Sequence, residues 1–224
     1  EEMFLNYPAQ CLIKISLGKN KISSVHPKAF HHLSSLEVLD LSNNSITLLY
    51  PKIFTHMPIL RWLNLSHNHI DTINQDAFIG LSHLDELYLT HNYLTSIKPC
   101  MFMGLNNLTI LSLNNSYITE LYPDAFKGLT NLYRLYLDDN YIDTIHPNAF
   151  RGLTNLERLD LNNNNITTIC SSAFDGLTYL RYLYLKNNNI TEIPIQVESF
   201  LSNIRDLDID LSTLKITGGY DDDY

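Results

Sequence analysis

The sequence repeats itself every 24 residues, and this period restricts the possible folds more than any other feature. Segments 129–152 and 153–176 are identical at fourteen of twenty-four positions. The shared pattern, LxxLxLxxNxIxxIxxxxFxxLxx, runs in phase through eight copies, which begin at Leu12, Leu36, Leu60, Leu84, Leu108, Leu132, Leu156 and Leu180. A ninth, partial copy begins at Ile204. Such a period is typical of a solenoid, in which each copy packs only on its neighbours.

The first part of each copy has the alternation of a β-strand. Numbered from the first leucine, positions 4 and 6 are apolar, whereas positions 3, 5 and 7 vary. This is the period of a strand with one buried face. One copy cannot bury that face alone, but stacked copies form a continuous parallel sheet and core. We therefore expect one short strand per copy, with the varied side chains on the exposed face.

Position 9 and position 19 recur almost unchanged. Position 9, where the chain turns out of the strand, is Asn20, Asn44, Asn68, Asn92, Ser116, Asn140, Asn164 and Asn188. An Asn amide offers a donor and an acceptor to neighbouring coils, so we expect a hydrogen-bond ladder with a weaker rung at Ser116. Position 19 is Phe30, Phe54, Phe78, Phe102, Phe126, Phe150 and Phe174, which predicts an aromatic spine. Glu198 takes this position in the eighth copy and Phe200 follows it, which indicates that the regular solenoid ends there.

Four copies carry an AFxGL element in the turn before the next copy. It reads AFIGL at 77–81, AFKGL at 125–129, AFRGL at 149–153 and AFDGL at 173–177. With the repeat pattern, this element resembles the leucine-rich-repeat family, specifically the 24-residue type of animal receptor ectodomains and secreted recognition proteins. The resemblance covers about residues 12–203. It implies an α/β-type solenoid, a curved horseshoe with a parallel sheet on its concave face, which binds proteins or other large ligands.

We divide the chain into four segments. Residues 1–11 are expected to form an N-terminal lead-in or cap, and residues 12–203 the solenoid of eight full repeats. Residues 204–217 hold the partial ninth repeat or C-terminal cap, and residues 218–224 are an acidic tail that begins with two glycines.

Recognition is expected at the positions that vary between copies. Tyr and Arg most often anchor protein interfaces, and they are densest at positions 3 and 5 of copies 6 to 8. The predicted ligand-binding residues are Trp62, Tyr88, Arg134, Tyr136, Arg158, Asp160, Tyr182 and Tyr184. The alternative is a solvated sheet face with Tyr packed flat and Arg–Asp pairs across strands. Arg134 and Arg158 share one position in adjacent copies, so an anion should lie nearby: either Asp160, or a carboxylate or sulfate of the ligand.

Two clusters of possible metal ligands have simpler explanations. His67 and His91 lie at one position in adjacent copies, but no third ligand is obvious, so we expect surface histidines and no bound metal or cofactor. Asp206, Asp208 and Asp210 alternate along the last strand. They are too far apart to share a calcium ion comfortably, and charge on a terminal strand prevents edge-to-edge pairing.

Several features favour a secreted or extracellular protein. Glycosylation acceptors of the form Asn-x-Ser/Thr occur at Asn43, Asn64, Asn107, Asn114, Asn165 and Asn189. Tyr220 and Tyr224 flank three aspartates and resemble sites of tyrosine sulfation, although a plain disordered tail is the alternative. Three cysteines are an odd number, so Cys11 is a candidate for an intermolecular disulfide in a homo- or heterodimer. The alternatives are a disulfide to a preceding segment of the chain and a buried free thiol.

Composition excludes several classes of function. The net charge of −9 argues against nucleic acid as a partner. No apolar run approaches the roughly 18 residues of a membrane span. The chain begins at Glu1 without a leader, as expected if a signal has been removed or if the chain is a fragment. No catalytic triad, zinc motif or phosphate loop stands out, so we expect no enzyme.

The leading hypothesis is a non-catalytic, secreted or cell-surface module that binds a protein through the concave face of repeats 6–8, with a possible role in innate immunity or adhesion. The alternatives are an intracellular or structural scaffold of the same fold, or a binder that acts through a sulfated acidic tail.

Overall fold

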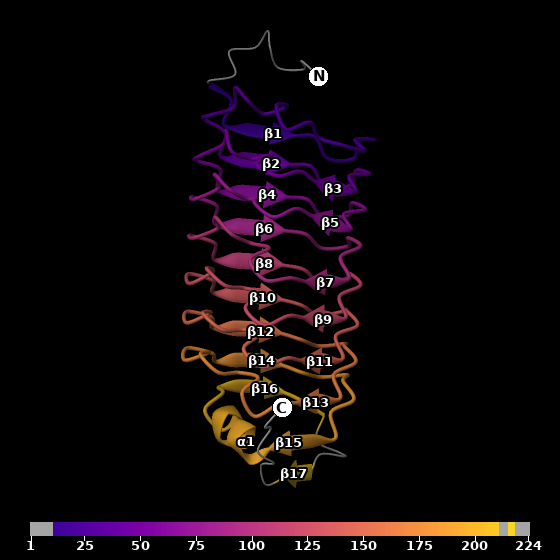
Figure 1. Ribbon diagram of the computed structural model, residues 1–224, viewed down its shortest axis with the longest axis vertical. Helices are drawn as coiled ribbons and strands as arrows, with labels where there is room; N and C mark the ends of the chain where they lie inside the picture. The colour runs from indigo at the N-terminus through magenta and orange to yellow at the C-terminus, as the bar shows by residue number, and fades with distance from the viewer. Residues whose placement is uncertain (1–10, 211–214, 218–224) are drawn as a thin grey trace.

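A computed structural model describes residues 11–210 and 215–217, and these form one solenoid of parallel strands (Figure 1). Nine strands make the main sheet in sequence order: Lys14–Ser16 (β1), Val38–Asp40 (β2), Trp62–Asn64 (β4), Glu86–Tyr88 (β6), Ile110–Ser112 (β8), Arg134–Tyr136 (β10), Arg158–Asp160 (β12), Tyr182–Tyr184 (β14) and Asp206–Asp208 (β16). Each residue pairs with the residue 24 positions later, as Leu135 does with Leu159. The predicted fold class, a leucine-rich-repeat horseshoe with a parallel sheet, is confirmed.

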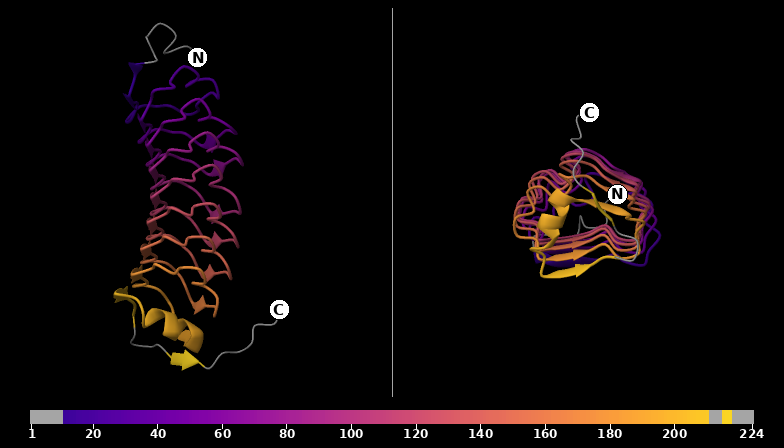
Figure 2. Two further views of the ribbon diagram at one scale, coloured as in Figure 1. Left: turned by 90° about the vertical axis from the view of Figure 1, so that its left-hand side faces the viewer. Right: turned by 90° about the horizontal axis from the view of Figure 1, so that it is seen from below.

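The main sheet lies on the concave side of a gently curved stack (Figure 2). In every strand from β1 to β14 the middle residue is buried and both flanking residues project from the opposite face. This is the expected alternation. The buried residues, such as Leu111 and Leu135, have no exposed surface and join one continuous core.

One expectation about the strands was wrong, because copies 2 to 8 each contain a second short strand. These strands are Leu48–Leu49 (β3), Thr72–Ile73 (β5), Ser96–Ile97 (β7), Glu120–Leu121 (β9), Thr144–Ile145 (β11), Thr168–Ile169 (β13) and Glu192–Pro194 (β15), and β15 pairs with Lys215–Thr217 (β17). They form the second column of strands in Figure 1. Two residues are too few to show a strand period in the sequence.

The phenylalanine spine is confirmed, and it extends one residue beyond the expected end. Neighbouring rings from Phe30 to Phe174 stack with centroids 5.9–6.4 Å apart. The ring of Phe200 then stacks on Phe174 at 5.2 Å. Phe200 reaches this place from the helix Ile195–Leu201 (α1), which replaces the turn of the other copies. Among the described residues α1 is the one α-helix, so the solenoid has little helical content.

The asparagine ladder is also confirmed. Asn140, for example, donates from Nδ2 to the carbonyls of Leu113 and Leu137 at 3.1 and 3.0 Å, and its Oδ1 accepts from the backbone N–H of Ile118 at 3.1 Å. Each amide thus ties two adjacent coils. Ser116 breaks the ladder, since its buried Oγ has no hydrogen-bond partner among the described residues.

Candidate functional site

The tyrosine- and arginine-rich strands β10, β12 and β14 lie side by side on the concave face. Their register forms two rows. Position 3 aligns Arg134, Arg158 and Tyr182, and position 5 aligns Tyr136, Asp160 and Tyr184. Six of the eight predicted ligand-binding residues therefore form one contiguous surface.

Arg158 is the centre of this surface. Its guanidinium carbon lies 5.4 Å from the ring centroid of Tyr136 and 4.6 Å from that of Tyr184, so it contacts two rings on neighbouring strands. Its Nη2 also pairs with Oδ2 of Asp160 at 3.2 Å. Burial lowers the pKa of Arg158, but the hydrogen bond to Asp160 and the nearby tyrosines outweigh this effect and raise its pKa. Asp160 thus supplies the expected anion for Arg158, but it forms no salt bridge with Arg134.

These contacts fix the side chains before any ligand binds. The hydroxyl of Tyr184 donates to Oδ2 of Asp206 at 3.0 Å, and burial together with this bond raises the pKa of Tyr184. Asp160 is only 7% exposed. Side chains held in this way lose little conformational entropy when a partner docks.

Arg134 and Tyr182 are the less constrained members of the surface. Arg134 is exposed and lies 5.4 Å from the centroid of Tyr133. Within the described residues it forms no salt bridge. Tyr182 is half-buried on β14. Both remain open to new contacts.

Trp62 and Tyr88 form a second aromatic group on β4 and β6, with ring centroids 5.7 Å apart. The hydroxyl of Tyr88 donates to Oε2 of Glu86 at 2.6 Å. Burial and this bond raise the pKa of Tyr88 to about 12, so it stays protonated at physiological pH. Strand β8, with Ile110 and Ser112 on its exposed face, separates this pair from the Arg158 group.

Asp138, which follows β10, was not singled out in the sequence. Burial is the main reason that its pKa rises to about 6, and the charge of nearby Asp160 adds to the effect. The sequence did contain a sign of this unusual site: position 7 is Asp138 in copy 6, whereas it is Asn114 and Asn162 in the flanking copies.

The histidines lie outside the concave sheet. The rings of His67 and His91 stack at 4.1 Å, and burial together with the charge of His91 lowers the pKa of His67. In the parts of the chain that the structure describes, no group of three or more His, Cys, Asp or Glu residues is arranged to hold a metal ion. Asp206 and Asp208 lie on β16 at the edge of the main sheet, and Asp210 accepts a hydrogen bond from the backbone N–H of Asn187 at 2.8 Å.

The predicted modification sites differ in accessibility. The side chains of Asn43, Asn107, Asn165 and Asn189 are exposed. Asn64 and Asn114 are half-buried, and their Oδ1 atoms accept hydrogen bonds from the backbone N–H of Ser66 and from Ser112 Oγ. Cys11 is exposed, and all three cysteines are free. Tyr220 and Tyr224 lie outside the described residues.

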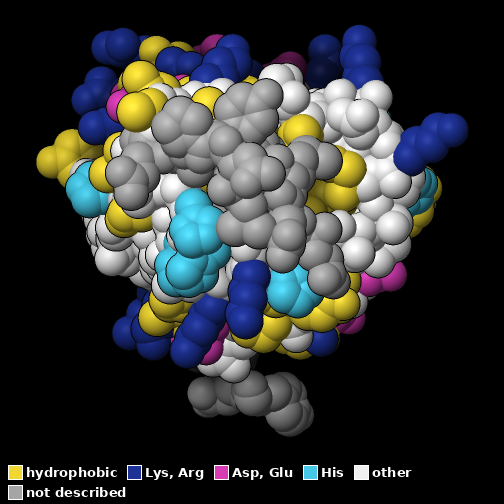
Figure 3. All heavy atoms as spheres, turned by 90° about the horizontal axis from the view of Figure 1, so that it is seen from above, with side chains coloured by type: hydrophobic (Ala, Val, Ile, Leu, Met, Phe, Trp, Pro, Cys, Tyr) yellow, Lys and Arg dark blue, Asp and Glu magenta, His cyan; other side chains and the backbone are white. Residues whose placement is uncertain are grey.

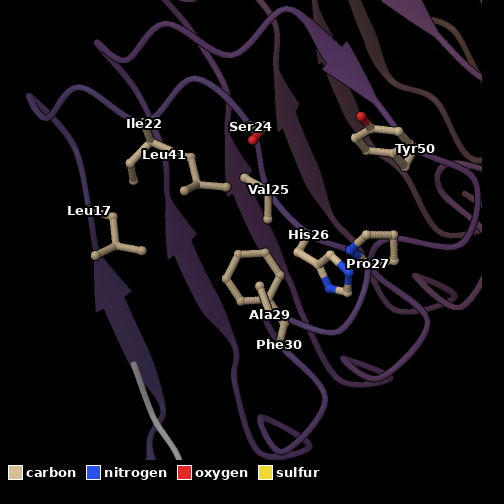
Figure 4. Close-up of a pocket in the computed structure, with 10 residues that line it drawn as sticks. All are labelled: Leu17, Ile22, Ser24, Val25, His26, Pro27, Ala29, Phe30, Leu41 and Tyr50. Carbon is tan, nitrogen blue, oxygen red and sulfur yellow. The ribbon is translucent and has the colours of Figure 1, made fainter. Parts of the chain in front are cut away.

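A hollow of about 570 Å³ opens at the N-terminal end of the solenoid. Leu17, Ile22, Val25 and Phe30 point into it, with Tyr50 at one side (Figure 4). Seen from this end, Lys and Arg side chains lie around the outer edge of the molecule (Figure 3). The hollow is the N-terminal end of the described hydrophobic core, and the polar side chains in its lining are those of Ser24, His26 and Tyr50.

Comparisons with known proteins agree with this architecture. A family model described as leucine rich repeat matches residues 12–70, 67–115, 106–166 and 154–214. The crystal structure of the TLR13–ssRNA13 complex is similar, with a TM-score of 0.82 and 30% identity, over 91% of this chain and 32% of that chain. An internalin C2 from Listeria monocytogenes is similar with a TM-score of 0.66 and 25% identity, over 88% of this chain and 80% of that one.

This chain therefore spans about a third of the TLR13 chain that it matches. A search of curated proteins found no match. Among the described residues, no helix has the length and hydropathy needed to cross a membrane.

Proposed function

The chain belongs to the leucine-rich-repeat family, and from this premise we propose that it is a non-catalytic recognition module, which binds a macromolecular partner through the concave face of repeats 6–8. The repeat is typical of protein-interaction modules, and the similar structures agree with that general role. The observation that carries the proposal is Arg158, held between Tyr136 and Tyr184 and paired with Asp160.

That arrangement has the properties of a binding hot spot. Interface hot spots are enriched in Tyr and Arg that are already well packed. The Arg158 group is neutralised internally, so a partner does not need to supply a buried counter-ion. Arg134 and Tyr182 border it and provide a cation and an aromatic side chain for direct contacts.

A protein is the better-supported class of partner. The TLR13 structure is a complex with RNA. Here the net charge is −9, and one of the two arginines on this surface is already paired with Asp160, so little positive charge remains for phosphates. We therefore propose a protein ligand. We also propose that the protein acts outside the cell, in a process such as innate immunity or adhesion.

Differential capture tests the concave face. The intact protein and its Tyr182→Ala and Tyr184→Ala variants would be incubated with a panel of purified extracellular protein domains. Tyr122→Ala is the control, because Tyr122 is an exposed tyrosine that follows β9 in the second column of strands, away from the concave face. We expect at least one domain to bind the wild type and the control with equal affinity. The same domain should bind each concave-face variant with an affinity lower by about tenfold or more. Equal binding by all four proteins would contradict the proposal.

The extracellular setting has its own test. The intact mass of the protein from its native source would be measured with and without glycosidase and reductant. We expect glycosidase to remove mass from exposed acceptors such as Asn165 and Asn189. A species that halves in mass on reduction would indicate a disulfide-linked dimer through Cys11. A bare, reduced monomer would instead favour an intracellular scaffold.

A further inference from the structure

A second candidate surface follows the turns that leave the main-sheet strands, between the two columns of strands in Figure 1. Position 8 of each copy has a left-handed backbone, with φ between 53° and 57° from Lys19 to Asn187. The shared conformation places equivalent side chains in a row along the stack. In copies 3 and 4 this row contains the stacked rings of His67 and His91.

Position 10 forms a parallel row of aromatic side chains. Ring centroids are 5.2 Å apart for His69 and Tyr93, 5.5 Å for Tyr93 and Tyr117, and 5.9 Å for Tyr117 and Tyr141. The three tyrosines are 45–50% exposed, although Tyr117 already contacts Tyr93 edge to face and stacks on Tyr141. Ordered, exposed tyrosines are the side chains that antibody combining sites use most.

The two rows enclose a groove of about 450 Å³, which we call the turn groove. Its lining includes His67, His91, Tyr93, Tyr117, Asp139 and Tyr141. Ser116 also lines it, and the Oγ of this residue is buried without a hydrogen-bond partner among the described residues. This Oγ has almost no accessible surface, so a ligand in the groove does not reach it, and an internal water is the partner that it can take.

The charge of the turn groove indicates the kind of ligand. Asp139 is the one Asp, Glu, Lys or Arg that lines it. Asn163 donates from Nδ2 to Oδ1 of Asp139 at 2.8 Å and so orients the carboxylate. Tyr117 and Tyr141 line the same groove. Among the described residues, no Lys or Arg side chain pairs with Asp139 or lies over these two rings.

Elsewhere in this molecule, tyrosines and an aspartate together bind a cationic side chain. On the concave face, two tyrosines and one aspartate, Tyr136, Tyr184 and Asp160, surround the guanidinium of Arg158. The turn groove also has two tyrosines and an aspartate in its lining, but Tyr117 and Tyr141 stack on each other with centroids 5.9 Å apart. A cation there would therefore lie against Asp139 and one ring, not between two rings. Aromatic faces and a carboxylate together favour guanidinium and ammonium groups.

We propose that the turn groove is a second binding surface, which takes an extended peptide segment of a partner protein and places an Arg or Lys side chain against Asp139 and Tyr141. The remaining tyrosines of the groove contact the rest of the segment. This surface is separate from the concave sheet, so its binding does not depend on the proposed function of that face.

Peptide selection on the intact protein tests this proposal. A random peptide library displayed on phage would be selected on the wild-type protein and depleted on the Asp139→Asn/Tyr141→Ala double variant. Enriched peptides would then be synthesised, and their affinities measured by fluorescence anisotropy. We expect them to share an Arg or Lys. Replacing that residue by neutral citrulline or norleucine should weaken binding about tenfold or more.

Variants of the protein locate the contact. Asp139→Asn alone should weaken binding by a similar factor, whereas Tyr141→Phe, which keeps the ring, should retain it. Asn189→Ala, at position 10 two copies away, and Tyr184→Ala on the concave face should leave affinity unchanged. Thermal unfolding of each variant would establish that the fold is intact.

Three results would overturn the proposal. One is enrichment of peptides without a shared basic residue. Another is affinity that survives Asp139→Asn in a folded protein. The third is a selection in which the double variant retains every peptide that wild type retains.

Discussion

Asp138 shows how a single residue can report on the concave face. Its pKa is raised to about 6, mainly by burial. The folded state therefore holds the proton more tightly than the unfolded chain does. The resulting stabilisation is complete below pH 3.8 and is lost as the pH rises through about 6. At neutral pH the ionised carboxylate is consequently a cost to the fold.

Asp138→Asn should remove that cost. We expect the variant to be more stable than wild type at pH 7.5 by about 1 kcal/mol, a value reduced from the full shift because the side chain is partly exposed. The advantage should disappear near pH 3.5. Urea unfolding at the two pH values would measure it. The flanking copies already carry Asn114 and Asn162 at this position, so the backbone accepts the change. A similar gain at both pH values would contradict the assignment.

Ser116 permits a test of the asparagine ladder at the same scale. Asn92 binds the backbone N–H of Ile70 and the carbonyls of Leu65 and Leu89. By the same geometry, Ser116→Asn should supply equivalent bonds one copy later and stabilise the fold by about 1 kcal/mol.

The reverse substitution, Asn140→Ser, is the matched comparison. It should cost about 2 kcal/mol, because it leaves buried backbone groups without partners. Urea midpoints of the two variants, measured by circular dichroism, should move in opposite directions. Shifts in the same direction would show that the amide bonds do not control stability at this position.

At the scale of the element, sequence periodicity was sufficient for the main strands, the ladder and most of the spine. In each of these, residues of one kind recur at one position of the repeat. Phe126 and Phe150, for example, share position 19 and stack on each other. The second strands and α1 lacked that signal. A two-residue strand has no measurable period, and the seven residues of α1 occur in the one copy that departs from the repeat.

The contacts of Arg158 also required the structure. Sequence spacing aligns Arg158 with Arg134 and Tyr182 in one row. The two rings that Arg158 contacts, however, belong to Tyr136 and Tyr184, which lie in the neighbouring row. The side-chain conformation decides between these neighbours, and the repeat pattern contains no information about it.

The phenylalanine spine is the element whose disruption should be most damaging. Phe126 is fully buried in mid-stack, whereas Phe200 is half-buried in the terminal helix. Phe126→Ala should cost about 3–5 kcal/mol, and Phe200→Ala about 1–2 kcal/mol. Urea unfolding of both variants would measure the difference. Equal costs would mean that α1 is as integral to the core as the middle copies.

At the scale of the whole molecule, the solenoid keeps its scaffold constant and varies its faces. Charge is unevenly distributed along the chain: residues 1–112 carry 7 basic and 8 acidic groups, whereas residues 113–224 carry 8 and 16. The Arg158 group and the acidic end of the turn groove both lie in this second half. A partner that approaches it is expected to be basic overall, so its association should slow as salt is added.

The most direct test of the account is site-specific photo-crosslinking in the native source. Benzoylphenylalanine would be placed at Tyr182 on the concave face, or at Tyr122 in the second column of strands, and the adducts compared after irradiation. If the concave face of repeats 6–8 binds a protein, position 182 should give one discrete protein adduct that position 122 does not give. An adduct from Tyr122 alone, or the same adducts from both positions, would contradict recognition by the concave face of repeats 6–8.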